Sequence, residues 1–288
     1  MPKAQKPSRA TVSTKKGSGR SAPATAELLL EIGVEELPYQ FISPALARLK
    51  ESAEQLLTEQ RLTFQAVRTL GTPRRLTLVV EGLITQQASV MKEAMGPSKA
   101  VAFDQAGLPT RAAVGFAAGQ GVAVQDLQVR QTPKGEYLFA VKREDGRPSK
   151  TVLMELLPQL VAKLSFPKAM KWNEAGVRFA RPVRWLVVLF DGAVLPIEAA
   201  GIKAGNRTRG HRVLGAKQGV VVRDGATYVK ALEKDGVIPD PERRRAIISE
   251  QISMLCQKTG FVLNEDAALL DQAVYTTEWP YAIIGSFK

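Results

Sequence analysis

Apolar residues along this chain form two patterns: short continuous runs, and longer stretches with an apolar residue every three or four positions. The continuous runs predict strands at residues 28–33, 75–81, 137–141 and 183–190. The last of these runs gives the strongest signal for a buried strand. The Asp191-Gly192 pair follows it and predicts a hairpin turn into residues 194–198. A further turn is expected at residues 71–74.

The helical spacing of apolar residues predicts helices at residues 43–60, 109–119, 149–164, 241–258 and 267–277. We expect the first helix to begin with Ser43 as its N-cap and Pro44 in its first turn. Pro158 lies inside the third helix. Because proline removes a backbone hydrogen bond, it is expected to kink that helix or to divide it in two.

The order of these elements predicts an α+β fold with mixed sheets and packed helices. Strands and helices alternate irregularly, without the repeated βαβ period of a parallel sheet. Residues 1–26 are basic and lack hydrophobic periodicity, which predicts a disordered tail. We expect residues 27–150 to form an N-terminal α+β body and residues 151–288 to form a second α+β region that ends in helices.

The charge of the chain indicates a polyanionic partner, although half of the excess belongs to the predicted tail. The 288 residues carry a net charge of +12, and residues 1–25 hold six Lys and Arg and no acidic residue. No stretch is apolar enough for a membrane span or a secretion signal, which favours the cytoplasm. The single cysteine, Cys256, excludes a disulfide within the chain and a cysteine-based zinc site, and it is expected to pack in the core.

The sequence contains no self-sufficient catalytic constellation. It lacks a Gly-x-x-x-x-Gly-Lys-Ser/Thr loop, and the glycine-rich residues 115–121 do not match Gly-x-Gly-x-x-Gly. One histidine and one cysteine, without a tight group of carboxylates, do not predict a metal site. Spacing alone leaves a Ser-His-Asp triad open, but His211 lies in a cationic turn and is a poor candidate for a general base. We therefore expect no catalytic residue and no metal in this chain.

The only histidine belongs to the run AGNRTRGHR, at residues 204–212, which supplies three arginines and no carboxylate. Guanidinium groups suit phosphate oxygens, and the two glycines permit a turn or a close approach to another surface. The candidate RNA contacts in this run are Arg207, Arg209, His211 and Arg212. A structural interpretation carries equal weight: the run fixes a turn whose arginines bridge to Glu35 or Glu36 across a domain boundary.

The acidic residues Glu31, Glu35 and Glu36 form a cluster before the first predicted helix. Such a cluster can bind a cation or an amine, or it can pair with an arginine at a domain junction. The sequence favours a simpler interpretation, in which solvated carboxylates lie near the positive end of a helix dipole.

A second basic segment, residues 163–185, interleaves cations with aromatic side chains, and this mixture suits single-stranded or looped RNA. Its candidate RNA contacts are Lys168, Lys171 and Arg178, for which a solvated loop is the alternative. Trp185 lies inside the apolar run at 183–190 and is expected in the core. Arg74 and Arg75 follow a turn, and they are weaker candidates for a contact with a phosphate backbone.

Several of these segments together resemble the beta subunit of bacterial heterotetrameric glycyl-tRNA synthetase. The most specific are RFARPVRWLV at residues 178–187 and AGIKAGNRTRGHR at residues 200–212. Others follow the family's order: LLLEIGVEELP at 28–38, GTPRRL at 71–76, GPS at 96–98, FPKAMKW at 166–172 and EWP at 278–280. The resemblance runs from about residue 27 to the last residue.

The resemblance implies the N-terminal part of such a subunit, truncated before the family's HD-type and anticodon-binding domains. It also implies that ATP and Mg²⁺ are used through a separate alpha subunit, so this chain is expected to hold no cofactor. The implied partners are that alpha subunit, in an alpha2beta2 tetramer, and the tRNA for glycine. The chain is then a beta-subunit fragment that supports glycine attachment through tRNA recruitment and subunit assembly. The alternative is a stand-alone, non-catalytic RNA-binding or assembly module.

Overall fold

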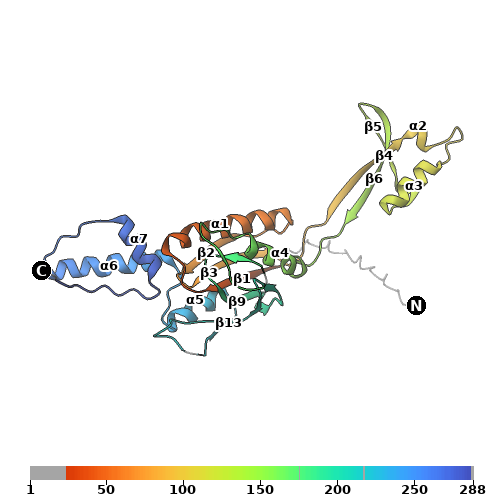
Figure 1. Ribbon diagram of the computed structural model, residues 1–288. Coiled ribbons are helices and arrows are strands. Elements are labelled where there is room, and N and C mark those ends of the chain that lie inside the picture. The colour runs from red at the N-terminus through yellow and green to blue at the C-terminus, as the bar shows by residue number, and fades with distance from the viewer. Residues whose placement is uncertain (1–23, 175, 217, 287–288) are drawn as a thin grey trace, which may run out of the picture.

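The computed structural model describes residues 24–174, 176–216 and 218–286 of the chain (Figure 1). Most of the predicted tail, residues 1–23, lies outside the described residues. The first strand, β1 (Thr25–Val34), begins two residues before the boundary that we expected at Glu27. The observed mixture of helices and mixed sheets confirms the predicted α+β class.

The body is built on a seven-stranded mixed sheet in which β1 and β9 occupy the middle. Its strand order is β11-β12-β9-β1-β3-β2, and β10 is paired to β9. All pairs are antiparallel except β12 with β9. The remaining strands of this sheet are β2 (Ala66–Thr72), β3 (Arg75–Ile84), β9 (Val183–Phe190), β10 (Ala193–Val194), β11 (Glu198–Ala199) and β12 (Ile202–Gly205).

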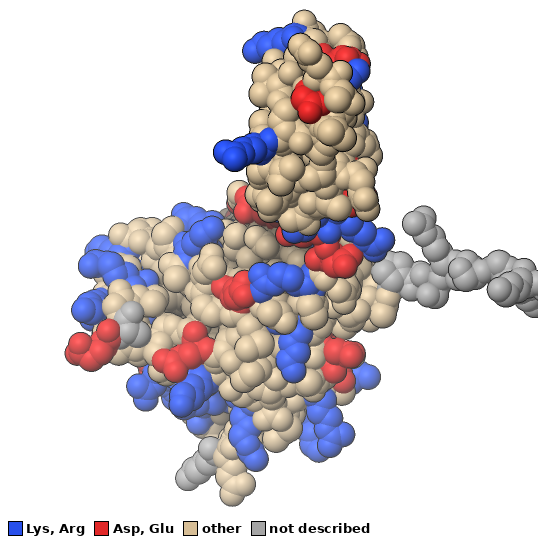
Figure 2. Space-filling model, turned by 90° about the vertical axis from the view of Figure 1, so that its right-hand side faces the viewer, with Lys and Arg blue, Asp and Glu red and all other residues tan. Residues whose placement is uncertain are grey.

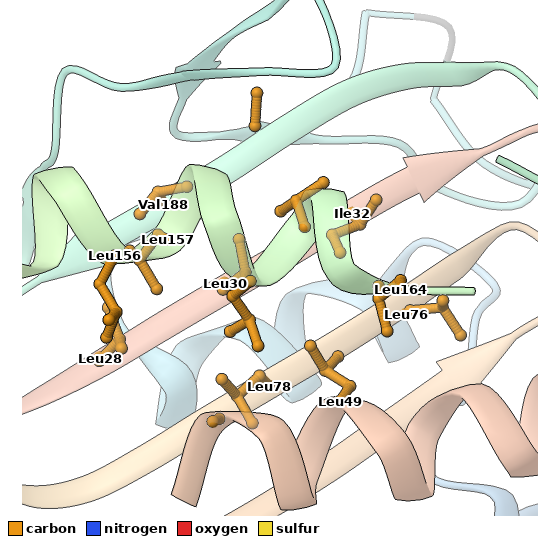
Figure 3. Packing of buried hydrophobic residues seen from close by; sticks show 14 of the residues in the cluster. Leu28, Leu30, Ile32, Leu49, Leu76, Leu78, Leu156, Leu157, Leu164 and Val188 are labelled. Carbon is orange, nitrogen blue, oxygen red and sulfur yellow. The ribbon is translucent and has the colours of Figure 1, made fainter. Parts of the chain in front are cut away.

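Helices cover both faces of this sheet because its central strands are apolar on both sides. Leu28, Leu30 and Ile32 of β1 pack with α1 (Tyr39–Glu59) and α4 (Ser149–Lys163) in the larger core (Figure 3). The opposite face of β1 presents Leu29, which packs with α5 (Gly225–Lys234) in a second cluster. Burial of each such leucine stabilises the fold by about 1.5–3 kcal/mol.

Two proline positions differ from the predicted helix geometry. Helix α1 begins at Tyr39 instead of after Ser43, so Pro44 lies inside it. Pro158 likewise lies inside α4, which is continuous and not divided. Each proline removes one backbone hydrogen bond. Both helices continue because their apolar faces are buried against the sheet on either side of the proline.

The hairpin between β2 and β3 is tighter than the predicted turn at residues 71–74. Thr72 pairs with Arg75, so only Pro73 and Arg74 connect the two strands. The expected turn after β9 is confirmed, but the returning strand β10 ends at Val194 and does not continue to residue 198. Asp191 and Gly192 have φ angles of 53° and 71°, in the left-handed region that a type I′ turn requires, and Ala193 pairs with Phe190.

A second unit, the arm (residues 90–144), projects from the body on two long strands (Figure 1). It has a small core of its own, formed by Ala102, Ala113 and Leu138. The main sheet joins β1 to β9 across residue 150. A strand from each of the two expected regions therefore lies in the same sheet. Its elements are β4 (Val90–Ser98), α2 (Lys99–Ala102), α3 (Arg111–Gln120), a 3₁₀ turn (Val124–Asp126), β5 (Gln128–Thr132) and β6 (Gly135–Glu144).

The chain continues from α5 into α6 (Pro241–Thr259) and α7 (Ala267–Thr276), close to the predicted bounds. Fully buried Arg244 of α6 donates hydrogen bonds to the backbone oxygens of Gly71, Ile238 and Val274, at 2.8, 2.6 and 2.9 Å. Burial lowers the pKa of Arg244 to about 10. Cys256 of α6 is only partly buried, so it does not pack in the core as expected.

Short strand pairs complete the body: β7 (Met170–Lys171) with β8 (Arg178–Phe179), and β13 (Arg207–Thr208) with β14 (Val220–Val221). Within the described ranges, no helix has the length and apolar character needed to cross a membrane.

Candidate functional site

A buried ion cluster, formed by Glu31, Arg75 and Glu278, lies on the α5 side of the main sheet. The Arg75 guanidinium contacts one carboxylate oxygen of each partner, at 3.4 Å to Glu31 and 3.2 Å to Glu278. Arg75 and Glu31 are fully buried, and Glu278 is 7% exposed. β1 and β3 supply the first two residues, and the segment after α7 brings Glu278 to them across some two hundred positions of sequence.

Hydroxyl and carbonyl groups supply further hydrogen bonds to this cluster, although Glu31 Oε2 is buried without a partner among the described residues. Arg75 also donates to the Thr72 hydroxyl at 3.2 Å and to the Arg209 carbonyl at 2.9 Å. Thr208 donates to Glu31 at 2.6 Å, and Thr72 donates to Glu278 at the same distance. Every edge of the Arg75 guanidinium is therefore occupied.

This arrangement corrects the prediction for Arg75, which we expected to contact RNA or water, and it places Arg74 largely inside the body. Arg75 is 0% exposed and Arg74 is 8% exposed. The tight hairpin points both side chains into the body, where Arg74 donates to the Gly210 carbonyl at 3.1 Å and lies 3.5 Å from Glu278. Arg75 has no exposed N–H group with which to contact a phosphate backbone. Arg74 reaches the surface only through the pocket described below.

The pKa values of the two carboxyl groups in the cluster are shifted in opposite directions. Burial raises the pKa of Glu31 above its usual value, and the opposing effect of Arg75 does not cancel it. Burial also acts to raise the pKa of Glu278. There, Arg75, the Thr72 hydrogen bond and Arg74 outweigh burial and hold the pKa below its usual value.

Trp185 connects the cluster to the surface. Its indole N–H donates to Glu31 at 3.0 Å, and its ring lies over Gly33, where an added side-chain carbon would collide with it. The guanidinium centres of Arg74, Arg75 and Arg209 lie 5.8, 5.8 and 5.0 Å from the centroid of the ring. Trp185 is 7% exposed, which confirms its predicted place in the core.

Above the ring lies a surface cavity of about 240 Å³, which we call the arginine pocket. One carboxylate, Glu35, lines it together with Trp185 and His211. Four arginines complete its charged lining: Arg74, Arg184, Arg209 and Arg212. The lining is therefore strongly cationic. Arg209, His211 and Arg212, which are close neighbours in one run of sequence, all line this pocket.

The ion pairs at the rim of the pocket agree with the structural interpretation of this run, in which its arginines bridge to Glu35 or Glu36. Arg212 contacts Glu35 at 3.0 Å and Glu36 at 3.3 Å, and Arg184 contacts Glu35 at 3.2 Å. The predicted bridge from the run to Glu35 and Glu36 is thus confirmed for Arg212. The acidic cluster divides: Glu31 is buried, whereas Glu35 and Glu36 lie on the surface as ion-pair partners.

His211 organises the turn that forms one wall of the pocket. Its Nδ1 accepts hydrogen bonds from the backbone N–H groups of Val213 and Leu214, at 3.2 and 3.0 Å. The backbone N–H of His211 donates to the Asp235 carbonyl at 2.9 Å. With Nδ1 accepting two backbone hydrogens, the neutral ring carries its proton on Nε2. This geometry gives His211 a role in shaping the turn.

The other candidate RNA contacts lie outside the pocket. Arg207 of β13 is exposed and donates to the Gln218 carbonyl at 3.4 Å. Lys168, Lys171 and Arg178 are exposed around β7 and β8 and form a separate basic surface. The aromatic rings interleaved with them do not form an open stacking platform, because Phe166 packs on fully buried Phe179 at a centroid distance of 4.6 Å.

Sequence reasoning missed Arg184 and Glu278 as parts of this region. Arg184 could have been found, because it is a lone charged residue inside the apolar run of β9. It occupies the one exposed position of that strand. Glu278 gave no local signal. In the part of the chain that the structure covers, no three His, Cys, Asp or Glu side chains lie close enough together to hold a metal ion.

Comparison with known proteins gives one consistent result. A family model described as glycyl-tRNA synthetase beta subunit matches residues 28–288. The glycine–tRNA ligase beta subunits of Geobacter metallireducens and Trichlorobacter lovleyi are 48% and 49% identical to this chain over 91% and 90% of its length. That of Moorella thermoacetica is 46% identical over 91%. The chain spans 38% of the length of each of these relatives.

Proposed function

The chain belongs to the glycyl-tRNA synthetase beta subunit family, and we propose that it supports the ATP-dependent attachment of glycine to its tRNA. In this proposal it recruits tRNA and assembles with an alpha subunit in an alpha2beta2 enzyme of the cytoplasm. ATP, Mg²⁺ and glycine are used by the alpha subunit, so this chain contributes binding surface and no catalytic residue.

The arginine pocket is the observation that carries the RNA part of the proposal. An arginine side chain presents several N–H donors in a fixed fork, which suits phosphate oxygens. Lys168, Lys171 and Arg178 add a second basic surface on the same body, and Arg207 lies exposed on β13. In the view of Figure 2, Lys and Arg lie over much of the body, whereas the arm shows fewer of them, mixed with Asp or Glu. We therefore assign tRNA contact to the body.

The test of this assignment is tRNA affinity measured at several salt concentrations. We expect the triple variant R207A/R209A/R212A to bind tRNA more weakly than the unaltered chain and with a smaller salt slope, since each lost phosphate contact lowers that slope by about one. The variant K168A/K171A/R178A tests the second surface in the same way. Arg111→Ala is the matched control, because Arg111 is an exposed arginine on the arm. Unchanged affinity and slope in both triple variants contradict the assignment.

The enzymatic part of the proposal is tested with the alpha subunit. The chain alone is expected to give no glycyl-tRNA from glycine and ATP, and charging by the chain alone would overturn the proposed division of labour. Co-purification of the two chains supports assembly. Binding of tRNA without any association with the alpha subunit instead identifies a stand-alone RNA-binding module.

A further inference from the structure

The four arginines of the arginine pocket are not equally neutralised. Glu35 is the one carboxylate in the lining, and it already pairs with Arg184 at 3.2 Å and with Arg212 at 3.0 Å. Arg212 has Glu36 as a second partner. The rim arginines are therefore satisfied by the rim carboxylates, and Glu35 is not available to the arginines deeper in the pocket.

Arg209 is the least satisfied of the four. Among the residues that the structure describes, its side chain has no hydrogen bond and no ion pair. Its contact is with the face of Trp185, 5.0 Å from the guanidinium centre to the ring centroid. Stacking on an indole fixes the plane of a guanidinium and leaves its N–H edges free to donate.

Arg74 forms the inner side of the pocket and is also incompletely paired. One terminal nitrogen contacts the Gly210 carbonyl and Glu278, but Nε is buried without a hydrogen-bond partner among the described residues. Glu278 itself is shared with Arg75. Burial lowers the pKa of Arg74, and the neighbouring charges of Arg75 and Arg212 act in the same direction against that of Glu278. The centre of the pocket thus carries an excess of positive charge.

We propose that the arginine pocket is a binding site for a single phosphate group, held between Arg74 and Arg209 above the ring of Trp185. The cavity of about 240 Å³ accommodates one phosphate with water. The guanidinium groups of Arg74 and Arg209 both line the pocket, and together they offer several N–H donors to the oxygens of a phosphate. Gly210, which also lines the pocket, packs so closely on the Asp235 carboxylate that an added side-chain carbon would collide with it.

The direct test uses inorganic phosphate and the 288-residue chain, with isothermal titration calorimetry at constant ionic strength. Phosphate is expected to bind saturably to one site, and chloride or acetate at the same ionic strength is expected not to reproduce the binding. Arg209→Ala is expected to lower phosphate affinity by about tenfold or more, since a hydrogen bond to a charged group contributes about 1.5–3 kcal/mol. Arg209 is exposed, so its removal leaves the buried ion cluster intact.

Two further variants define the site. Arg209→Lys keeps the charge and loses the planar fork, and it is expected to bind phosphate with an affinity between those of the unaltered chain and Arg209→Ala. Arg111→Ala, on the arm, is expected to match the unaltered chain. The proposal is overturned if phosphate binds no better than chloride, or if Arg209→Ala binds phosphate as well as the unaltered chain does.

The source of the phosphate is a separate question that rests on the proposed function. If the group belongs to RNA, inorganic phosphate competes with a tRNA transcript and Arg209→Ala weakens tRNA binding. If it belongs to a small molecule, phosphate binds through Arg209 and tRNA affinity does not change. Both results support the phosphate site, whereas failure to bind tRNA at all contradicts only the proposed function.

Discussion

Arg75 and Arg212 are each paired with two glutamates, yet they lie at opposite extremes of burial. Arg75 is fully buried between Glu31 and Glu278, and the Arg212 side chain is 55% exposed between Glu35 and Glu36. The pair distances are similar, from 3.0 to 3.4 Å. Geometry alone therefore does not distinguish these two arrangements.

The difference between them lies in the surrounding solvent. At the rim, water screens the charges, and an exposed pair contributes little to stability. In the buried cluster, the charges have lost their hydration, and each group depends on its partners. The rim pairs can therefore open when a ligand approaches, whereas the buried cluster holds strands and the segment after α7 together.

The largest expected effect comes from breaking the buried cluster. Arg75→Met leaves Glu31 and Glu278 buried without their shared cation, and removal of one partner of a buried pair typically destabilises a protein by about 3–5 kcal/mol. Urea-induced unfolding followed by circular dichroism measures the change. A loss below about 1 kcal/mol, the upper range for an exposed pair, would show that the buried cluster behaves like the rim.

The second-largest change in stability is expected at the ring of Trp185, which lies between the buried cluster and the ion pairs of the rim. Gly33→Ala places a methyl group against Trp185, and such overpacking costs about 1–3 kcal/mol. The matched control is Gly115→Ala in α3, where no atom lies within contact distance of the added carbon and alanine favours the helix by about 0.5–1 kcal/mol. Equal stability of the two variants would contradict the close packing of Trp185 on β1.

The smallest change in stability is expected at the rim. Arg212→Ala should destabilise the fold by about 0.2–1 kcal/mol, and raising the salt concentration should reduce the difference. Unfolding midpoints measured at low and high salt check this expectation. A loss as large as that of Arg75→Met would show that the rim is not solvated in the way its exposure indicates.

The pH dependence of stability separates the two glutamates of the buried cluster. The pKa of Glu278 is lowered, so its contribution is present above the ordinary value of 4.5 and is lost as the pH falls through the lowered pKa. The pKa of Glu31 is raised, so its contribution is present below 4.5 and is lost as the pH rises through the raised pKa. Glu278→Gln should therefore weaken the acid-induced loss of stability, and Glu31→Gln should weaken the loss above pH 4.5. Identical pH profiles for the two variants would contradict this assignment.

The framework of the main sheet could be predicted because its central strands are apolar on both faces. β1 and β9 are continuous apolar runs, and the same property placed Trp185 in the core. β2 was missed because exposed polar residues interrupt its apolar positions and its last residues resemble a turn. The start of α1 was misplaced because a Ser-Pro pair resembles a helix start even where it lies inside a helix.

The candidate site was predicted only where its residues are neighbours in sequence. Arg209, His211 and Arg212 belong to one run, and the bridge to Glu35 followed from the opposite charges of two such runs. Arg75 was expected on the surface because a turn usually exposes its cations. Its burial depends on Glu278, which arrives from the other end of the chain, and no local pattern contains that information.

The hydrogen bonds of Arg244 and the ion pairs of Glu278 connect the C-terminal helices to the main sheet. Arg244 ties the C-terminal helices α6 and α7 to the edge strand β2, and Glu278, just after α7, is the counter-charge of Arg75 in the middle of the sheet. Glu278 also contacts Arg74, so the segment after α7 reaches the inner side of the arginine pocket. The C-terminal helices are thus connected, through hydrogen bonds and ion pairs, to the arginine that forms the inner side of the proposed phosphate site.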